Sequence, residues 1–256
     1  MVASGPVDMA GWSLAVTARS ETGPVRSHNE DCYALRTDLG LWVVADGMGG
    51  LARGDLASRA VCTAVTGLPA GLTGADLRTA FARAIGQVHA RLLAEQISFG
   101  PSGTTVVALL FENGRYRVFW AGDSRAGRLR AGRLEWLTVD HNLAARMVQL
   151  GRMSDEEARR HPLASRLTRA VGIGEELELD EVAGRIEAGD LFILCSDGLT
   201  GELGDAEIAA ALAGDEDLER AADELCDLAV RRRHARDNVT FVLVKVLDGV
   251  AGRQQG

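Results

Sequence analysis

The chain has 256 residues, of which 46% are hydrophobic and 25% are charged, a composition typical of one globular domain with a sizeable core and not of a disordered or fibrous chain. Its formal net charge of −8 argues against sequence-independent binding of nucleic acid, which needs a basic surface. The single lysine, Lys245, lies in an apolar run, so neither a Walker-type phosphate loop nor a protein-kinase lysine site can be built around it.

The N-terminal part of the chain predicts a meander of strands followed by two helices. Residues rich in β-branched and aromatic side chains, separated by polar turns, indicate strands at 12–19, 32–37 and 41–45. Two helices are expected next, at 52–67 and 75–98. In the second helix Leu77, Phe81 and Ile85 recur at helical spacing, so one face of it must be buried.

The rest of the chain predicts further hairpins and helices. Between 103 and 138 the expected strands are TTVVALLF, YRVFWAG, RAGRLR and LEWLT, and the turns at Asn113-Gly114 and Ala131-Gly132 indicate antiparallel hairpins. Residues 141–172, here called the flap, predict a helix near 142–150 and a second one opened by a capping box from Ser154 to Glu157. The remaining elements are expected as strands at 177–183 and 190–196, helices at 205–213 and 216–233, and a strand at 238–247. Hairpins interrupted by helix pairs favour an α+β fold, with antiparallel sheets and helices packed outside them.

Cysteine usage and the absence of long apolar segments point to the cytoplasm. The four cysteines lie in apolar segments without any CxxC spacing, as free thiols in a reducing compartment would: Cys32, Cys62, Cys195 and Cys226. The N-terminus lacks the basic and apolar regions of a signal peptide, and no apolar run approaches the roughly 18 residues of a membrane span. We therefore expect a cytoplasmic protein that contacts neither membrane nor nucleic acid.

Four aspartates stand where an apolar strand meets a turn: Asp46 in VVADG, Asp123 in AGDSR, Asp197 in CSDG and Asp237 in RDNVTF. An Asp-Gly pair taken alone is typical of a turn. A carboxylate directly after a buried strand is costly, however, unless a cation compensates its charge. Because hard divalent ions prefer oxygen ligands, the set predicts a metal site, to which the Gly47 carbonyl can add a ligand.

A second constellation combines a cation with two acids: Arg26, Glu30 and Asp31 in the segment GPVRSHNED. A guanidinium can hold two oxygens of a phosphate, and neighbouring acids can hold metal-bound waters. A salt bridge within a surface loop is the alternative for this segment taken alone.

The motifs occur along the chain in the order RSHNED, ADGMGG, SGTTVV, AGDSR, LTVDHNL, LTRAVG, CSDGLTGEL and RDNVTFVLV. As an ordered set from about residue 19 to 246, they resemble the metal-dependent Ser/Thr protein phosphatases of the PPM family (type 2C), in their bacterial form. The resemblance implies a four-layer α-β-β-α sandwich, in which two antiparallel β-sheets are flanked by helix pairs and a flap segment lies over the sheet. We expect a single domain over 12–248, with flexible termini at 1–11 and 249–256.

The resemblance also implies a metal-dependent hydrolase. Two Mn²⁺ or Mg²⁺ ions would activate a water that attacks the phosphorus of phosphoserine or phosphothreonine directly, without a phosphoenzyme, and so oppose Ser/Thr kinases. Asp46 would bridge the ions, the Gly47 carbonyl would bind one of them, and Asp197 and Asp237 would bind the other. Further roles carried over by position are water-mediated metal contacts for Glu30 and Asp31, a phosphate clamp for Arg26, and a weaker third ion for Asp123, to which Ser165 of the flap is a loosely aligned candidate ligand.

The chain departs from the family pattern at one catalytic position. Met48 stands where animal members carry a histidine proposed as proton donor, so the leaving oxygen would take its proton from elsewhere, such as a metal-bound water. Leu51 and Asp55 also differ from the commoner residues, and we expect them to tune activity. Two alternatives stay open: a metal-binding pseudophosphatase that serves as a regulatory module, which the presence of all core ligands disfavours, and a two-metal hydrolase of a non-protein phosphate ester.

Overall fold

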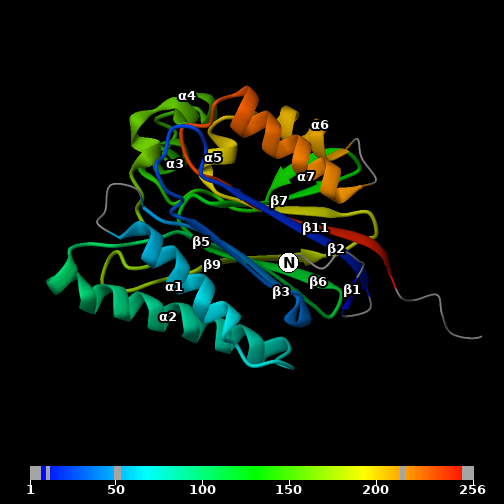
Figure 1. Cartoon of the computed structure of the whole chain (residues 1–256), viewed down its shortest axis with the longest axis horizontal. Helices are drawn as coiled ribbons and strands as arrows, with labels where there is room; N and C mark the ends of the chain where they lie inside the picture. The colour runs from blue at the N-terminus through cyan, green and yellow to red at the C-terminus, as the bar shows by residue number, and fades with distance from the viewer. Residues whose placement is uncertain (1–6, 10–11, 49–52, 214–216, 250–256) are drawn as a thin grey trace, which may run out of the picture.

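Two antiparallel sheets lie face to face at the centre of the computed structural model, which describes residues 7–9, 12–48, 53–213 and 217–249 (Figure 1). Over these residues the six-stranded sheet has the spatial order β1 (Val7–Met9), β2 (Trp12–Glu21), β11 (Val239–Gly249), β10 (Leu191–Cys195), β7 (Arg125–Arg130) and β8 (Arg133–Trp136). The five-stranded sheet has the order β3 (Asp31–Arg36), β4 (Leu41–Asp46), β5 (Val106–Glu112), β6 (Arg115–Ala121) and β9 (Asp180–Arg185). All neighbouring strands in both sheets pair antiparallel, as the hairpin pattern predicted.

Helices cover the outer face of each sheet and complete four layers. On the five-stranded sheet lie α1 (Gly54–Thr66) and α2 (Gly74–Phe99). On the six-stranded sheet lie α5 (Asp197–Thr200), α6 (Asp205–Ala213) and α7 (Leu218–Asp227). In Figure 1 the two groups of helices are on opposite sides of the paired sheets. The α-β-β-α sandwich expected from the sequence is therefore confirmed.

Burial on both faces explains the nearly continuous apolar runs of the central strands. In β4, Trp42 and Val44 point into the core between the sheets, while Val43 packs against the α1 and α2 side. In β10, Phe192 points between the sheets and Ile193 points toward α6 and α7. Successive side chains of a strand point to opposite faces, so a strand covered on both sides needs apolar residues throughout.

The flap folds as three short helical pieces: α3 (Leu143–Gln149), α4 (Asp155–Arg160) and the 3₁₀ turn η2 (Pro162–Ser165). The capping box predicted at Ser154 and Glu157 is present at the start of α4, and the Asn142 side chain accepts a hydrogen bond of 2.9 Å from the backbone of α3. The C-terminal end of the flap is tied to the domain by reciprocal backbone hydrogen bonds between Thr104 and Val171, of 3.0 and 2.9 Å.

Three sequence expectations differ from the structure. The helix expected at 216–233 is interrupted, because α7 ends at Asp227 and a π-helical turn, Leu228–Arg232, follows. Residues 7–9, within the segment expected to be flexible, form β1, because their backbone pairs with β2. The strand expected at 177–183 lies at Asp180–Arg185, where it pairs with β6. A short 3₁₀ turn, η1 (Thr37–Leu39), also separates β3 from β4.

None of the helices in the described part of the chain combines the length and the apolar character that a membrane span requires.

Candidate metal centre

Carboxylates from both sheets meet at one end of the sandwich. β4 ends at Asp46, and its register partner is Asp31, the first residue of β3. Asp197 lies two residues after the end of β10, Asp237 stands two residues before β11, and Asp123 lies in the turn between β6 and β7. Because β10 is antiparallel to both β11 and β7, its C-terminal end meets the start of each of them. The fold therefore gathers the four aspartates that the sequence singled out, together with Asp31; we call these five residues the carboxylate cluster.

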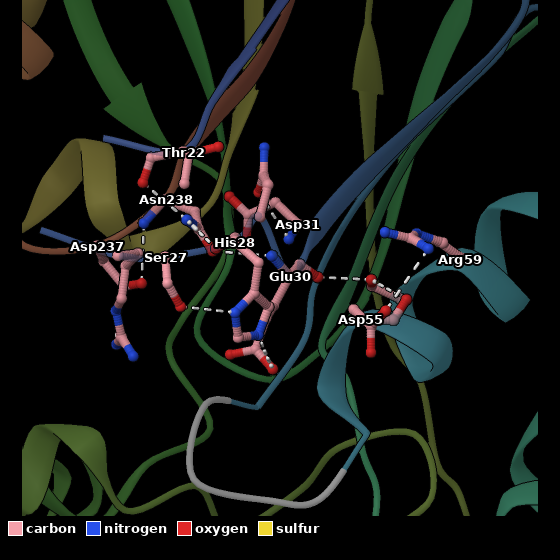
Figure 2. A network of polar contacts seen from close by, with 12 residues as sticks. Thr22, Ser27, His28, Glu30, Asp31, Asp55, Arg59, Asp237 and Asn238 are labelled. Carbon is pink, nitrogen blue, oxygen red and sulfur yellow. Dashed lines mark hydrogen bonds and ion pairs between the residues drawn. The ribbon is translucent and has the colours of Figure 1, made fainter. Parts of the chain in front are cut away.

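Hydrogen bonds join the two sheets at this end. The Ser196 hydroxyl, at the end of β10, donates to Oδ2 of Asp31 at 2.8 Å. The backbone N–H of Glu30, just before β3, donates to Oδ1 of Asn238 at 2.9 Å (Figure 2). These contacts hold the start of β3 against the end of β10 and the start of β11, so the carboxylate cluster straddles both sheets.

The cluster is electrostatically uncompensated at its centre. Burial is the largest cause that raises the pKa of Asp46 well above its usual range, and the negative charges of Asp31 and Asp197 add to it. Burial also raises the pKa of Asp123 well above normal, with Asp197 and Asp140 as further causes. Neighbouring carboxylates therefore oppose one another's ionisation.

In two further members of the cluster, Asp31 and Asp197, hydrogen bonds partly offset the rise in pKa. Burial raises the pKa of Asp31 to about 7, although hydrogen bonds from Ser196 and Thr240 act in the opposite direction. Burial and then Asp237 raise the pKa of Asp197 to about 6, although a hydrogen bond with the Asp46 carboxyl lowers it. Asp197 is exposed to solvent and Asp46 is partly accessible, so a ligand can reach both carboxylates.

This chemistry fits a divalent cation. Positive charge placed among these oxygens would relieve the repulsion, and oxygen-only ligands suit Mg²⁺ and Mn²⁺. Among the described residues, no three acidic, histidine or cysteine side chains converge closely enough to enclose an ion by themselves. A complete shell would therefore need backbone carbonyls and water in addition to the carboxylates.

Glycine beside two of the aspartates is required by close packing. A Cβ on Gly47 would lie 2.4 Å from the carbonyl oxygen of Gly54 and 2.6 Å from that of Glu30. A Cβ on Gly198 would lie 2.0 Å from the carbonyl oxygen of Asn238. Neither glycine is among the described residues with positive φ, so these Asp-Gly pairs are not left-handed turns. Their small size lets neighbouring backbone approach the carboxylate cluster.

Arg26 lies beside the cluster. It belongs to the connection between β2 and β3, and its Nη2 donates to Oδ2 of Asp237 at 2.6 Å. The side chains of Arg26 and Asp237 are 40% and 39% exposed, so the guanidinium can be reached from solvent. The hydrogen bond that Arg26 donates to Asp237 is the main cause that raises the pKa of Arg26. The loop salt bridge considered from the sequence is thus replaced by a long-range pair with a cluster aspartate.

The remaining candidates occupy different depths. Asp31 is 9% exposed, whereas the Glu30 side chain is 13% exposed and has its Oε1 3.6 Å from Nε2 of His28. Asp123 is 9% exposed. Ser165, in the flap, is exposed, and its hydroxyl donates to the carbonyl of Pro162 within η2 at 3.0 Å. The described contacts therefore do not join Ser165 to the carboxylate cluster.

Three polar residues at the site were not singled out as site residues from the sequence. Ser196 binds Asp31, Asn238 binds the connection between β2 and β3, and Asp140 makes two hydrogen bonds of 2.7 Å with Arg125 next to Asp123. Each occurs in a motif that carried the family resemblance, CSDGLTGEL, RDNVTFVLV or LTVDHNL. Position within those motifs was the only available signal.

The positions that depart from the family pattern are only partly described. The Met48 backbone N–H donates to the carbonyl of Gly103 at 3.0 Å, which ties the segment after Asp46 to the strand region before β5. Asp55 lies in the first turn of α1, where it forms an ion pair of 3.5 Å with Arg59. Leu51 lies outside the described residues.

Comparison with known proteins assigns the chain to a class. Residues 25–247 match the family model described as protein phosphatase 2C. The chain is 37% identical over 246 residues to the serine/threonine protein phosphatase PstP of Mycobacterium tuberculosis, across 94% of this chain and 47% of that protein. The chain therefore belongs to the protein phosphatase 2C (PPM) family of Ser/Thr protein phosphatases, and it spans about half the length of PstP.

Smaller relatives and solved structures agree with this assignment. The serine/threonine phosphatase stp of Listeria monocytogenes is 31% identical over 237 residues, across 89% of this chain and 94% of the relative. The crystal structure of the PstP catalytic domain, in complex with two manganese ions, superposes with a TM-score of 0.78 at 35% identity, across 92% of this chain and 99% of that one. The expected family resemblance is thus confirmed.

Proposed function

We propose that this chain hydrolyses phosphoserine and phosphothreonine in proteins, with two Mn²⁺ or Mg²⁺ ions held by the carboxylate cluster. The observation that carries the proposal is the meeting of Asp46 with four other aspartates at the seam of the two sheets. Burial and mutual repulsion raise the pKa values of four members of this cluster, Asp31, Asp46, Asp123 and Asp197. Such a group has no structural use that an apolar or neutral set would not serve better.

Each residue proposed to bind a metal ion would have its own role at the site. Asp46, at the centre, would contact both ions, and the Gly47 carbonyl would contact one of them. Asp197 and Asp237 would bind the other ion. Glu30 and Asp31 would act through water, and Asp123 would help to hold a third, weaker ion. When bound, the ions supply charge neutralisation for the phosphate and lower the pKa of the attacking water.

The protein's own groups would bind and orient the substrate. Arg26 is reachable from solvent and lies at hydrogen-bonding distance from Asp237, so its guanidinium is placed to hold phosphate oxygens at the edge of the cluster. Asp237 and the phosphate would share the Arg26 guanidinium, which carries five N–H donors and binds Asp237 through Nη2. The Arg26 side chain thus contributes positioning and charge neutralisation.

We also propose the setting in which the enzyme acts. Phosphorylated proteins would be its substrates, and Ser/Thr kinases or their targets its functional partners, since the reaction reverses theirs. The names of the similar proteins support this reading. A cytoplasmic location is supported by the four cysteines, all of which are free thiols.

The proposal is tested by hydrolysis of a phosphothreonine peptide. Turnover is expected with Mn²⁺, and loss of about 10³-fold or more is expected with chelator, with Asp46→Asn and with Asp197→Asn. Asp38→Asn is the matched control, because Asp38 is an exposed acid that pairs with Arg36 outside the cluster. Chelator-resistant turnover would refute the metal mechanism. Faster turnover of nucleotides or sugar phosphates would favour the non-protein ester hydrolase, and Mn²⁺ binding without any turnover would favour the pseudophosphatase.

A further inference from the structure

The Asn238 side chain makes three hydrogen bonds to backbone groups beside the carboxylate cluster. It lies directly after Asp237 and is only 3% exposed. Its Nδ2 donates to the carbonyl of Thr22 at 2.8 Å and to that of His28 at 3.1 Å, and its Oδ1 accepts from the N–H of Glu30 at 2.9 Å (Figure 2). One buried side chain therefore holds three backbone groups of the connection between β2 and β3.

These three contacts close a loop. Thr22 stands at the start of residues 22–30 and His28 and Glu30 stand at the end, so Asn238 ties both ends of this segment to the start of β11. We call residues 22–30 the Arg26 loop, because Arg26 lies near its middle. Fixing the ends of a loop removes most of the conformational freedom of the residues between them.

The loop and the metal-ligand candidate Asp237 are oriented together. The backbone N–H of Asn238 donates to Oδ1 of Asp237 at 2.8 Å, which leaves Oδ2 for Arg26. Gly23, at a φ of +74°, packs so closely that a Cβ there would lie 2.8 Å from the carbonyl oxygen of Asp237. The Arg26 loop therefore rests directly on the backbone that carries Asp237.

We propose that Asn238 is the positioning residue for Arg26: it holds both ends of the Arg26 loop against β11 and so sets the place of the guanidinium relative to Asp237 and to a bound phosphate. The phosphate part of this inference rests on the function proposed above. The Arg26 side chain is exposed, and its ion pair with Asp237 is exposed as well, so its position depends on the loop that carries it. Asn238 touches neither substrate nor reacting atoms and acts through Arg26.

The first test does not depend on activity. Amide hydrogen exchange over residues 22–30 is compared for the wild type, Asn238→Ala and Leu77→Ala, the last being a buried control in α2, far along the chain from the loop. Exchange is expected to accelerate at least about tenfold in the Arg26 loop of Asn238→Ala, and not in the control. Unchanged exchange, or equal acceleration in the control, would overturn the proposal. If Asn238→Ala does not fold, Asn238→Asp takes its place, because aspartate accepts from Glu30 but cannot donate to the two carbonyls.

The second test is a double-mutant cycle on phosphate affinity. The dissociation constant of inorganic phosphate, measured with Mn²⁺ present, is expected to rise about tenfold in Asn238→Ala and in Arg26→Ala, with no further rise in the double variant. In phosphopeptide hydrolysis the loss should fall mainly on KM. Additive losses in the double variant would show a general structural role and refute positioning. A wild type that neither hydrolyses phosphopeptide nor binds phosphate would refute the proposed function, and the exchange rates of the loop would then still decide whether Asn238 holds it.

Discussion

Replacing Asp46 by asparagine should make the metal-free protein more stable while it weakens the stabilisation by metal. Asp46 lies at the centre of the carboxylate cluster, where burial and the charges of Asp31 and Asp197 oppose its ionisation and so raise its pKa. The amide of asparagine has nearly the same shape but does not ionise, so Asp46→Asn removes the cost of holding an ionisable group there. The acid is therefore kept for a reason other than stability.

The size of the effect follows from the surroundings. Asp46 is partly accessible, so the gain is smaller than for a fully buried unpaired charge, and we expect about 1 to 2 kcal/mol in the metal-free state. For a domain of this size this corresponds to a rise in Tm of about 3 to 6 °C. With Mn²⁺ at about a thousand times its dissociation constant, the wild type should gain about 4 kcal/mol. Asp46→Asn should gain much less, so the order of stabilities reverses.

The assay is thermal unfolding of both proteins, in chelator and in Mn²⁺, at pH 7.5. Asp38→Asn, the same chemical change on the surface, should lower Tm slightly through the lost ion pair with Arg36, and by the same amount in chelator and in Mn²⁺. If Asp46→Asn is less stable than the wild type in chelator, the claim that the cluster is strained by like charges is wrong. If both proteins gain equally from Mn²⁺, Asp46 is not a ligand.

Three other outcomes are expected. Mn²⁺ affinity, measured by calorimetry, should fall as pH drops through about 7 and then about 6, because Asp31 and Asp197 take up protons there. In the metal-free protein the same raised pKa values mean that the folded state binds more protons than the unfolded state. The free energy of unfolding, measured in urea, should therefore fall as pH rises from about 4 to 7. Gly198→Ala should cost at least about 3 kcal/mol in urea unfolding, because its Cβ would lie 2.0 Å from a backbone oxygen, whereas Gly86→Ala, with open space around it in α2, should stabilise by about 0.5 to 1 kcal/mol; equal effects would contradict the packing argument. Among the four cysteines, Cys32 should react first with iodoacetamide near neutral pH, because a hydrogen bond from the buried thiol of Cys62 lowers the pKa of Cys32 to about 7. Mass spectrometry that finds another cysteine modified first would contradict this.

The elements and the aspartates could be predicted because their signals are local. The five-residue apolar runs before Asp46 and Asp197 mark strands that end at an acid, and antiparallel pairing alone then brings such ends together. The capping box at Ser154 is equally local. These features need only propensity, periodicity and turn chemistry.

Two of the missed features depend on contacts between distant segments. The ion pair of Arg26 with Asp237 spans 211 positions, and the hydrogen bond of Glu30 with Asn238 spans 208. No periodicity connects such residues, and a loop salt bridge was the natural local reading of Arg26. The π-helical turn after Asp227 was missed for a different reason. The apolar pattern continues through this turn, but its backbone hydrogen bond spans five residues: the N–H of Arg233 donates to the carbonyl of Leu228 at 3.1 Å.

The hydrogen bond from Ser196 to Asp31 has a consequence for how the folding chain acquires affinity for metal ions. Asp31 and Asp46 belong to one half of the sandwich, and Asp197 and Asp237 to the other, so neither half alone carries a complete set of oxygens. Partly assembled chains would therefore lack ion affinity even where their secondary structure is already formed. Uptake of metal during refolding would report the final docking of the halves, and damage that loosens this docking would abolish metal binding before the chain unfolds.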